Sequence, residues 1–142
     1  MNINDLQEMI AKDFPWDEGQ LEGENSKTTK LWIKYIKLWS DENLKIEILE
    51  NRLGQLIQQK RNYYGGNGTP EEYKAKPFNL KLRSDAAINK YVEGDDDVIK
   101  AKEKILIQKQ KVVVLSACLD EVKRRSFSLK NALDYYRFIN GG

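Results

Sequence analysis

The chain contains no histidine and a single cysteine, Cys118, among its 142 residues. A disulfide framework within one chain therefore cannot form, and zinc sites built from cysteine and histidine are excluded. Cys118 lies in the apolar run 112–119, where a small buried residue is expected. Because no histidine is available to activate its thiol, we assign it no catalytic role.

Segments that would direct the chain to a membrane are also missing. No leader with a positively charged start and an apolar centre opens the sequence, and no apolar run reaches the roughly 18 residues needed to span a bilayer. We therefore expect a cytoplasmic protein that has no membrane partner.

The sequence also lacks the motifs of nucleotide-binding proteins and of common enzymes. Neither the P-loop pattern G-x-x-x-x-G-K nor the dinucleotide pattern G-x-G-x-x-G occurs. Gly65, Gly66 and Gly68 follow a predicted helix instead of leading into one, so they do not form a phosphate loop. No carboxylate pair stands in an apolar context suited to acid–base catalysis. We predict a binding protein that is not an enzyme and that needs no cofactor and no metal.

Charge is abundant but unevenly distributed. Charged residues make up 32% of the chain, the mean hydropathy is −0.69 and the net charge is +2. Residues 1–25 carry seven carboxylates against one lysine, which is −6, and the remaining residues carry +8. An acidic head on a basic body suggests a protein that meets polyanions. The alternative for the head is an ordinary solvated helix face.

Heptad spacing predicts a first long helix over residues 26–64. Trp32, Trp39, Ile46 and Leu53 fall seven apart, and a second apolar row beside them is interrupted by Glu42. A helix of this length exceeds what one small domain can cover, so it should pack against another helix or another copy of the chain. The glycines at 65, 66 and 68 and Pro70 predict its end.

A second long helix is predicted to begin at the triplet Asp95-Asp96-Asp97. Carboxylates there favour the positive end of the helix dipole, whereas three consecutive aspartates point in different directions and suit a metal site poorly. Val98, Ile105, Val112 and Leu119 then repeat every seven residues. We expect the basic run 123–125 to close this helix and Ser128 to cap a last one.

These patterns predict an all-α protein. Two long amphipathic helices are joined by an irregular loop over 71–94 that contains short helical turns. A short helix capped by Asn4 precedes them, and a C-terminal helix follows. The predicted division is an acidic helix and linker at 1–25, a long helix with the loop after it at 26–94 and the C-terminal helices at 95–142.

The candidate site is a basic segment interleaved with aromatic residues. Residues 60–91 contain seven cations against three carboxylates, together with four tyrosines and Phe78. Cations that follow a phosphate backbone and rings that stack on bases bind single strands with little sequence preference. The predicted DNA-binding residues are Lys60, Arg61, Tyr63, Tyr64, Lys74, Lys76, Lys81 and Arg83. Alternatively, the tyrosines complete an apolar helix face and the hinge cations complement the helix dipole.

Four segments in order resemble the UvsY-type family of phage recombination mediators. They are the acidic start Asp5–Asp13, the tyrosine pair 63–64 between basic residues and glycines, Asp97-Val98-Ile99-Lys100, and Arg125–Lys130. The resemblance implies an all-helical subunit that assembles into a hexameric or heptameric ring in the host cytoplasm. Such a ring binds single-stranded DNA covered by single-strand binding protein and helps to load a RecA-like recombinase of the UvsX type. These steps serve recombination, repair and recombination-dependent replication.

The resemblance also assigns roles to residues. Lys60 stands at a DNA-contacting position, whereas Gln58 replaces a lysine of the family. DNA binding is expected of the part at 26–94, and the C-terminal helices of the part at 95–142 are implied to hold the ring together. The predicted oligomerisation residues are Val112, Leu115, Leu119, Val122, Phe127, Leu129, Leu133 and Tyr136. The competing hypothesis is a non-catalytic helical adaptor that binds only protein partners, with Tyr63 and Tyr64 in its interface.

Overall fold

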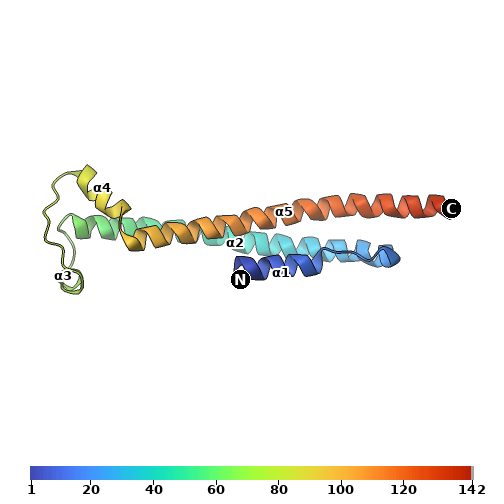
Figure 1. Ribbon diagram of the computed structural model, residues 1–142, viewed down its shortest axis with the longest axis horizontal. Coiled ribbons are helices and arrows are strands. Elements are labelled where there is room, and N and C mark those ends of the chain that lie inside the picture. Colours follow the sequence, from blue (N-terminus) through green and yellow to red (C-terminus); the bar gives the residue numbers. More distant parts are fainter. Residues whose placement is uncertain (142) are drawn as a thin grey trace. The chain divides into compact units, whose positions relative to one another are not determined.

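The computed structural model describes residues 1–141, and the regular structure of these residues is entirely helical (Figure 1). The all-α prediction is confirmed. None of the helices within the described residues is long and apolar enough to cross a membrane. The elements are α1 (Ile3–Asp13), a short 3-10 turn (Glu18–Gln20), α2 (Leu21–Tyr64), α3 (Pro70–Ala75), α4 (Asp85–Glu93) and α5 (Asp96–Ile139).

The two long helices contain 44 residues each. α2 begins at Leu21, five residues before the predicted start, so Gly23 lies inside it. It ends as predicted at the glycines: the Gly65 amide donates to the Arg61 carbonyl, and Gly66 adopts a positive φ of 84°. Glycine is favoured in that left-handed conformation because it has no Cβ.

The predicted break at residues 123–128 is absent, which corrects the sequence analysis. α5 continues to Ile139, the basic run 123–125 does not end it, and Ser128 caps nothing. No glycine or proline interrupts the helix, and Arg125 and Leu129 continue the buried face that Val122 belongs to. The predicted C-terminal helix is therefore the last part of α5.

Polar side chains start the short helices. Asn2, and not the predicted Asn4, caps α1 by accepting a hydrogen bond from the Asp5 amide at 2.8 Å. Thr69 caps α3, where Pro70 occupies the first turn. Ser84 caps α4. Each cap satisfies an amide that would otherwise lack a partner at a helix start, so the predicted loop 71–94 contains two defined helices.

The chain forms two compact units, and both long helices contribute to each. Unit 1 comprises Met1–Leu44 and the residues from Lys109 onward, and unit 2 comprises Lys45–Gln108. This division follows contacts in space and so differs from the three consecutive segments predicted from the sequence.

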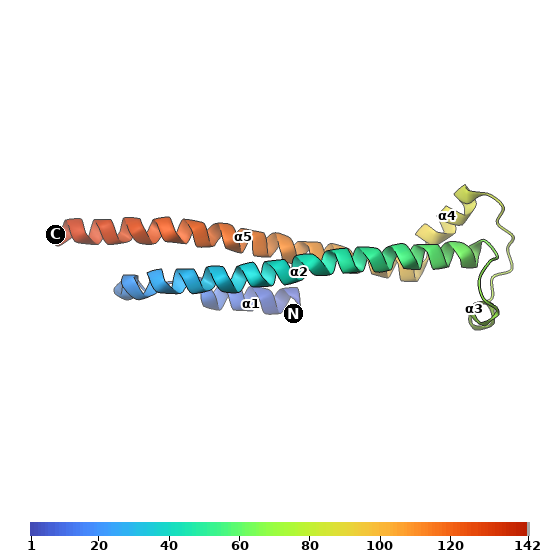
Figure 2. The same ribbon diagram turned by 180° about the vertical axis from the view of Figure 1, so that it is seen from behind.

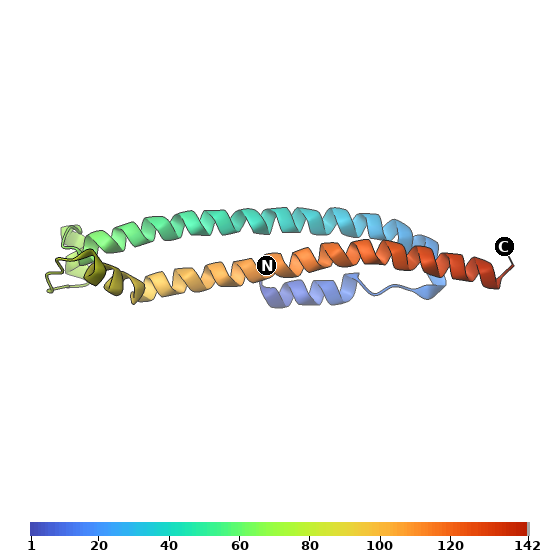
Figure 3. The ribbon, with the colours of Figure 1, turned by 90° about the horizontal axis from the view of Figure 1, so that it is seen from above.

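In unit 1, α1 packs beside the first part of α2 and the second part of α5 (Figures 2 and 3). Burial of Cys118 is as predicted, and it raises the pKa of this thiol to about 11. The buried core residues are Leu6, Leu31, Tyr35, Leu115, Cys118 and Val122.

A buried arginine of α5 ties the residue after α1 and the first turns of α2 to α5 in unit 1. The Arg125 guanidinium donates to the Thr28 hydroxyl at 3.0 Å, to the Phe14 carbonyl and to the Glu24 carboxylate. It also lies 5.8 Å from the centre of the Trp16 ring. A guanidinium loses its hydration when buried, and these partners replace it.

Candidate nucleic-acid interface

Tyr63 and Tyr64, at the end of α2, belong to the core of unit 2. They are 5% and 7% exposed, and their rings meet edge to face at 5.0 Å. Tyr63 stacks on Tyr73 at 5.1 Å, and Tyr64 meets Phe78 edge to face at 4.9 Å. With so little exposed surface, neither ring is a stacking platform for a base in this conformation.

The hydroxyl groups of these tyrosines hold neighbouring backbone in place. Tyr63 donates to the Lys76 carbonyl, and Tyr73 donates to the Tyr63 carbonyl at 2.7 Å. These bonds fix α3 and the residues after it against the end of α2. Lys60, Tyr63 and Lys76 consequently line one hollow of about 170 Å³, together with Gln59 and Glu72.

Lys60 is held in an ion-pair cluster. Its side chain is 15% exposed, and its ammonium lies 2.8 Å from the Asp97 carboxylate and 3.3 Å from that of Asp95. Burial disfavours the ammonium, but the bond to Asp97 and the charge of Asp95 outweigh it and hold the pKa of Lys60 above its ordinary value. A phosphate would have to compete with these carboxylates for this cation.

Asp95 is the centre of that cluster and the cap of α5. Its carboxylate accepts from the Asp97 amide at 2.9 Å, from the Val98 amide at 3.3 Å and from the Tyr64 hydroxyl at 2.6 Å. Burial raises the pKa of Asp95, but the hydroxyl bond, the Lys60 charge and the amide bond outweigh it and leave this pKa below its ordinary value. Burial and the same carboxylate raise the pKa of Tyr64. Capping by the aspartate triplet is confirmed, and Asp95 performs it.

Arg61 is also engaged, although it is more exposed. One guanidinium nitrogen donates to the Asn89 side chain, and another lies 3.7 Å from the Asp85 carboxylate. Both partners belong to α4. The two predicted hinge cations therefore contribute to the packing of unit 2.

The remaining predicted cations are exposed and unengaged. Within the part of the chain that the structure describes, no ion pair involves Lys74, Lys76, Lys81 or Arg83. They lie on α3 and on the segment that leads from it to α4. Unit 2 thus contains all eight predicted DNA-binding residues, with four exposed cations, two paired cations and two buried rings.

Lys90 and Tyr91, which the predicted site left out, lie together beside a hollow of unit 2. Lys90 is exposed and Tyr91 is 39% exposed, and both line a hollow of about 290 Å³ with Tyr64 and Gly94. In the sequence they are part of the basic aromatic segment. Their position beside Tyr64 depends on how α4 packs against the end of α2, and no local sequence pattern predicts that packing.

The fold is one that solved all-helical proteins share. Crystal structures of the bacteriophage T4 recombination mediator protein UvsY superpose with TM-scores of 0.83 at 23% identity and 0.82 at 22% identity. The first match covers 100% of this chain and 99% of the other, and the second covers 97% and 98%.

Sequence comparison shows the family. The family described as "Recombination, repair and ssDNA binding protein UvsY" matches residues 9–142. The recombination protein uvsY of Enterobacteria phage T4 is 24% identical over 141 residues, which cover 99% of each protein. The chain belongs to the UvsY family, so the resemblance found in its sequence is confirmed.

Proposed function

We propose that this protein binds single-stranded DNA as a homo-oligomeric ring and helps to load a RecA-like recombinase onto strands covered by single-strand binding protein. It acts in the host cytoplasm without catalysing a reaction. Family membership supports the mediator role. The observation that carries the DNA-binding role is the group of exposed, unpaired cations on unit 2: Lys74, Lys76, Lys81 and Arg83.

The exposed cations and the paired cations differ in what binding requires of them. An exposed lysine exchanges water and loosely held counterions for a phosphate, and the released counterions favour binding at low salt. Lys60 must first leave Asp97, and Arg61 must leave Asn89. The four exposed cations therefore make the first contacts with the strand, and the hinge pair contributes after its internal bonds have rearranged.

Apolar side chains that one subunit leaves exposed support the proposed oligomerisation. Of the predicted assembly residues, Leu115, Val122 and Leu129 are at most 3% exposed inside their own subunit, and Val112, Leu119 and Leu133 are half-buried. Phe127 and Tyr136 are 71% and 62% exposed. We assign the contact between subunits to these two and to their exposed neighbours on α5, which are Tyr135, Phe138 and Ile139.

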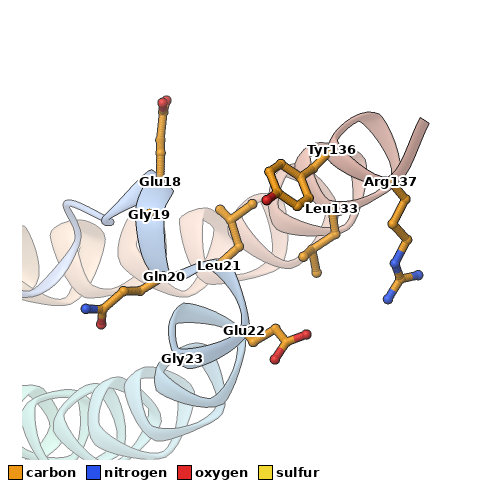
Figure 4. A pocket seen from close by; sticks show the side chains of 9 residues that line it. All are labelled: Glu18, Gly19, Gln20, Leu21, Glu22, Gly23, Leu133, Tyr136 and Arg137. Carbon is orange, nitrogen blue, oxygen red and sulfur yellow. The ribbon is translucent and has the colours of Figure 1, made fainter. Parts of the chain in front are cut away.

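The same end of α5 borders a hollow of unit 1. This hollow of about 530 Å³ lies between the residues that begin α2 and the last turns of α5. Figure 4 shows Leu21, Leu133 and Tyr136 around it. Charged side chains, those of Glu18, Glu22 and Arg137, line it together with these apolar ones. Exposed aromatic rings of α5 stand beside it, and we place the docking of another subunit at this end of the helix. A ring would repeat the few cations of one subunit and raise affinity through effective concentration.

Titration of fluorescent oligo-dT with light scattering of the same samples tests this function. Replacing Lys74, Lys76, Lys81 and Arg83 together by alanine should weaken binding while the mass of the oligomer stays unchanged. The salt slope should flatten by about 0.7 for each lost phosphate contact. The matched control replaces Lys12, Lys30, Lys37 and Lys123, which are exposed lysines of unit 1.

Equal weakening in both variants would show that only net charge matters. A wild-type protein that assembles but binds no oligo-dT at low salt would support the helical adaptor instead.

A further inference from the structure

The ring of Tyr91 combines exposure with fixed packing. It is 39% exposed, whereas Tyr63 and Tyr64 are nearly fully buried. Its centre lies 5.6 Å from that of Tyr64 and 5.5 Å from that of Phe78. A ring that already packs against two others loses little freedom when a ligand stacks on it, which lowers the entropic cost of binding.

The surroundings of this ring suit a nucleotide. Tyr91 lines a hollow of about 290 Å³ with Tyr64, Lys90 and Gly94. This volume is near the lower end of the roughly 300–1,000 Å³ typical of small-ligand sites, so the hollow has room for one base. Lys90 is exposed and has no ion pair within the described residues, so its ammonium is available for a phosphate.

Hydrogen bonds within the protein hold two residues that line the hollow, Tyr64 and Gly94. The Tyr64 hydroxyl donates to the buried carboxylate of Asp95, which fixes the ring against which Tyr91 packs. Gly94 caps the end of α4, and its amide donates to the Lys90 carbonyl at 3.2 Å. Glycine adds no side chain there, so the space beside Tyr91 stays open.

We propose that Tyr91 and Lys90 form a base-stacking subsite for one nucleotide of a single strand. The base lies on the exposed part of the Tyr91 ring, and Lys90 contacts an adjacent phosphate. This inference rests on the proposed DNA-binding function and moves the stacking role from Tyr63 and Tyr64 to Tyr91. It also adds Lys90, on α4, to the exposed cations of unit 2.

The test compares oligo-dT with an abasic deoxyribose-phosphate strand of the same length, using the full chain. Wild-type protein should prefer oligo-dT. Tyr91→Ala should weaken oligo-dT binding by about 5- to 150-fold without weakening binding of the abasic strand. Tyr91→Trp should retain the preference. Leu80→Ala, which removes an exposed apolar side chain of the same unit, is the matched control.

Photocrosslinking gives a direct second measurement. A strand with 5-iodouracil should crosslink to the peptide that contains Tyr91, as mapped by mass spectrometry. If wild-type protein binds both strands equally and Tyr91→Ala changes neither, the subsite is overturned while DNA binding stands. If wild-type protein binds neither strand at low salt, the DNA-binding function itself fails, and the subsite fails with it.

Discussion

The ammonium of Lys60 lies 2.8 Å from the Asp97 carboxylate. Lys60, which is predicted to contact DNA, is therefore already paired with an acidic residue of the same unit. The two carboxylates around Lys60 differ in exposure: the Asp97 side chain is 63% exposed and that of Asp95 is 1% exposed. Asp95 also caps α5 and accepts from Tyr64, so it is fixed. The contact with Asp97 is the one that a phosphate can replace.

Asp97→Asn should therefore strengthen binding of single-stranded DNA. Without the Asp97 carboxylate, the Lys60 ammonium can bind a phosphate without first losing this ion pair. An ion pair with one exposed partner contributes at most about 1 kcal/mol, so we expect a gain in affinity of at most about fivefold. Asp96→Asn removes the same charge from the neighbouring exposed position and is the control. Fluorescence anisotropy with oligo-dT at two salt concentrations measures both. An equal gain in affinity in the two variants would show that the change in net charge, and not the release of Lys60, strengthens binding.

Tyr64→Phe should destabilise the protein although it retains the ring. The substitution removes the hydroxyl that donates to Asp95 at 2.6 Å and leaves a buried carboxylate with one partner fewer. A hydrogen bond to a charged group contributes about 1.5–3 kcal/mol. Urea unfolding at one fixed protein concentration measures the change, because assembly makes stability depend on concentration. Tyr91→Phe, which removes the hydroxyl of a 39% exposed tyrosine in the same unit, should leave the midpoint unchanged.

The lowered pKa of Asp95 predicts a loss of stability in acid. Since the folded-state pKa lies below the ordinary value of 3.8, the stabilisation is fully present above that value. It is lost as the pH falls through the folded-state pKa. Asp95→Asn should be less stable than wild type near neutral pH, and the difference should shrink below about pH 3.8.

Urea midpoints from about pH 7 to about pH 2.5 measure this difference, with Asp96→Asn as the charge-matched control. A difference between wild type and Asp95→Asn that stays constant down to the lowest pH would refute the linkage.

The helices were predictable because their signals are local. The heptad rows predict α2 and α5, and the glycines after Tyr64 predict where α2 ends. The break at Ser128 was wrong because a basic run and a serine look like a helix end, whereas Arg125 finds Glu24 and Thr28 about a hundred residues earlier in the chain. A contact between residues so far apart in the sequence produces no periodic pattern from which it could be predicted.

The candidate site was predictable as a segment but not in its internal roles. Charge and aromatic content show where a polyanion is expected. They do not show that Asp95 and Asp97 hold Lys60, or that Tyr63 faces Tyr73, because those contacts depend on how α3 and the start of α5 pack against the end of α2. Tyr91 and Tyr63 are both tyrosines of the same basic aromatic segment, so composition does not distinguish them. Only the packing of the folded chain leaves one ring exposed and buries the other.

Phe127 and Leu129 lie two residues apart on α5 and should respond differently to truncation. Leu129 is fully buried in its own subunit, so Leu129→Ala should lower the free energy of unfolding by about 2–5 kcal/mol. Phe127 is 71% exposed, so Phe127→Ala should retain the helical content of the subunit and lower the assembled mass on dilution. Circular dichroism and light scattering over a dilution series measure both effects. Ser126→Ala, at the exposed neighbour, is the control; unchanged assembly of Phe127→Ala at every dilution would place the contact between subunits elsewhere.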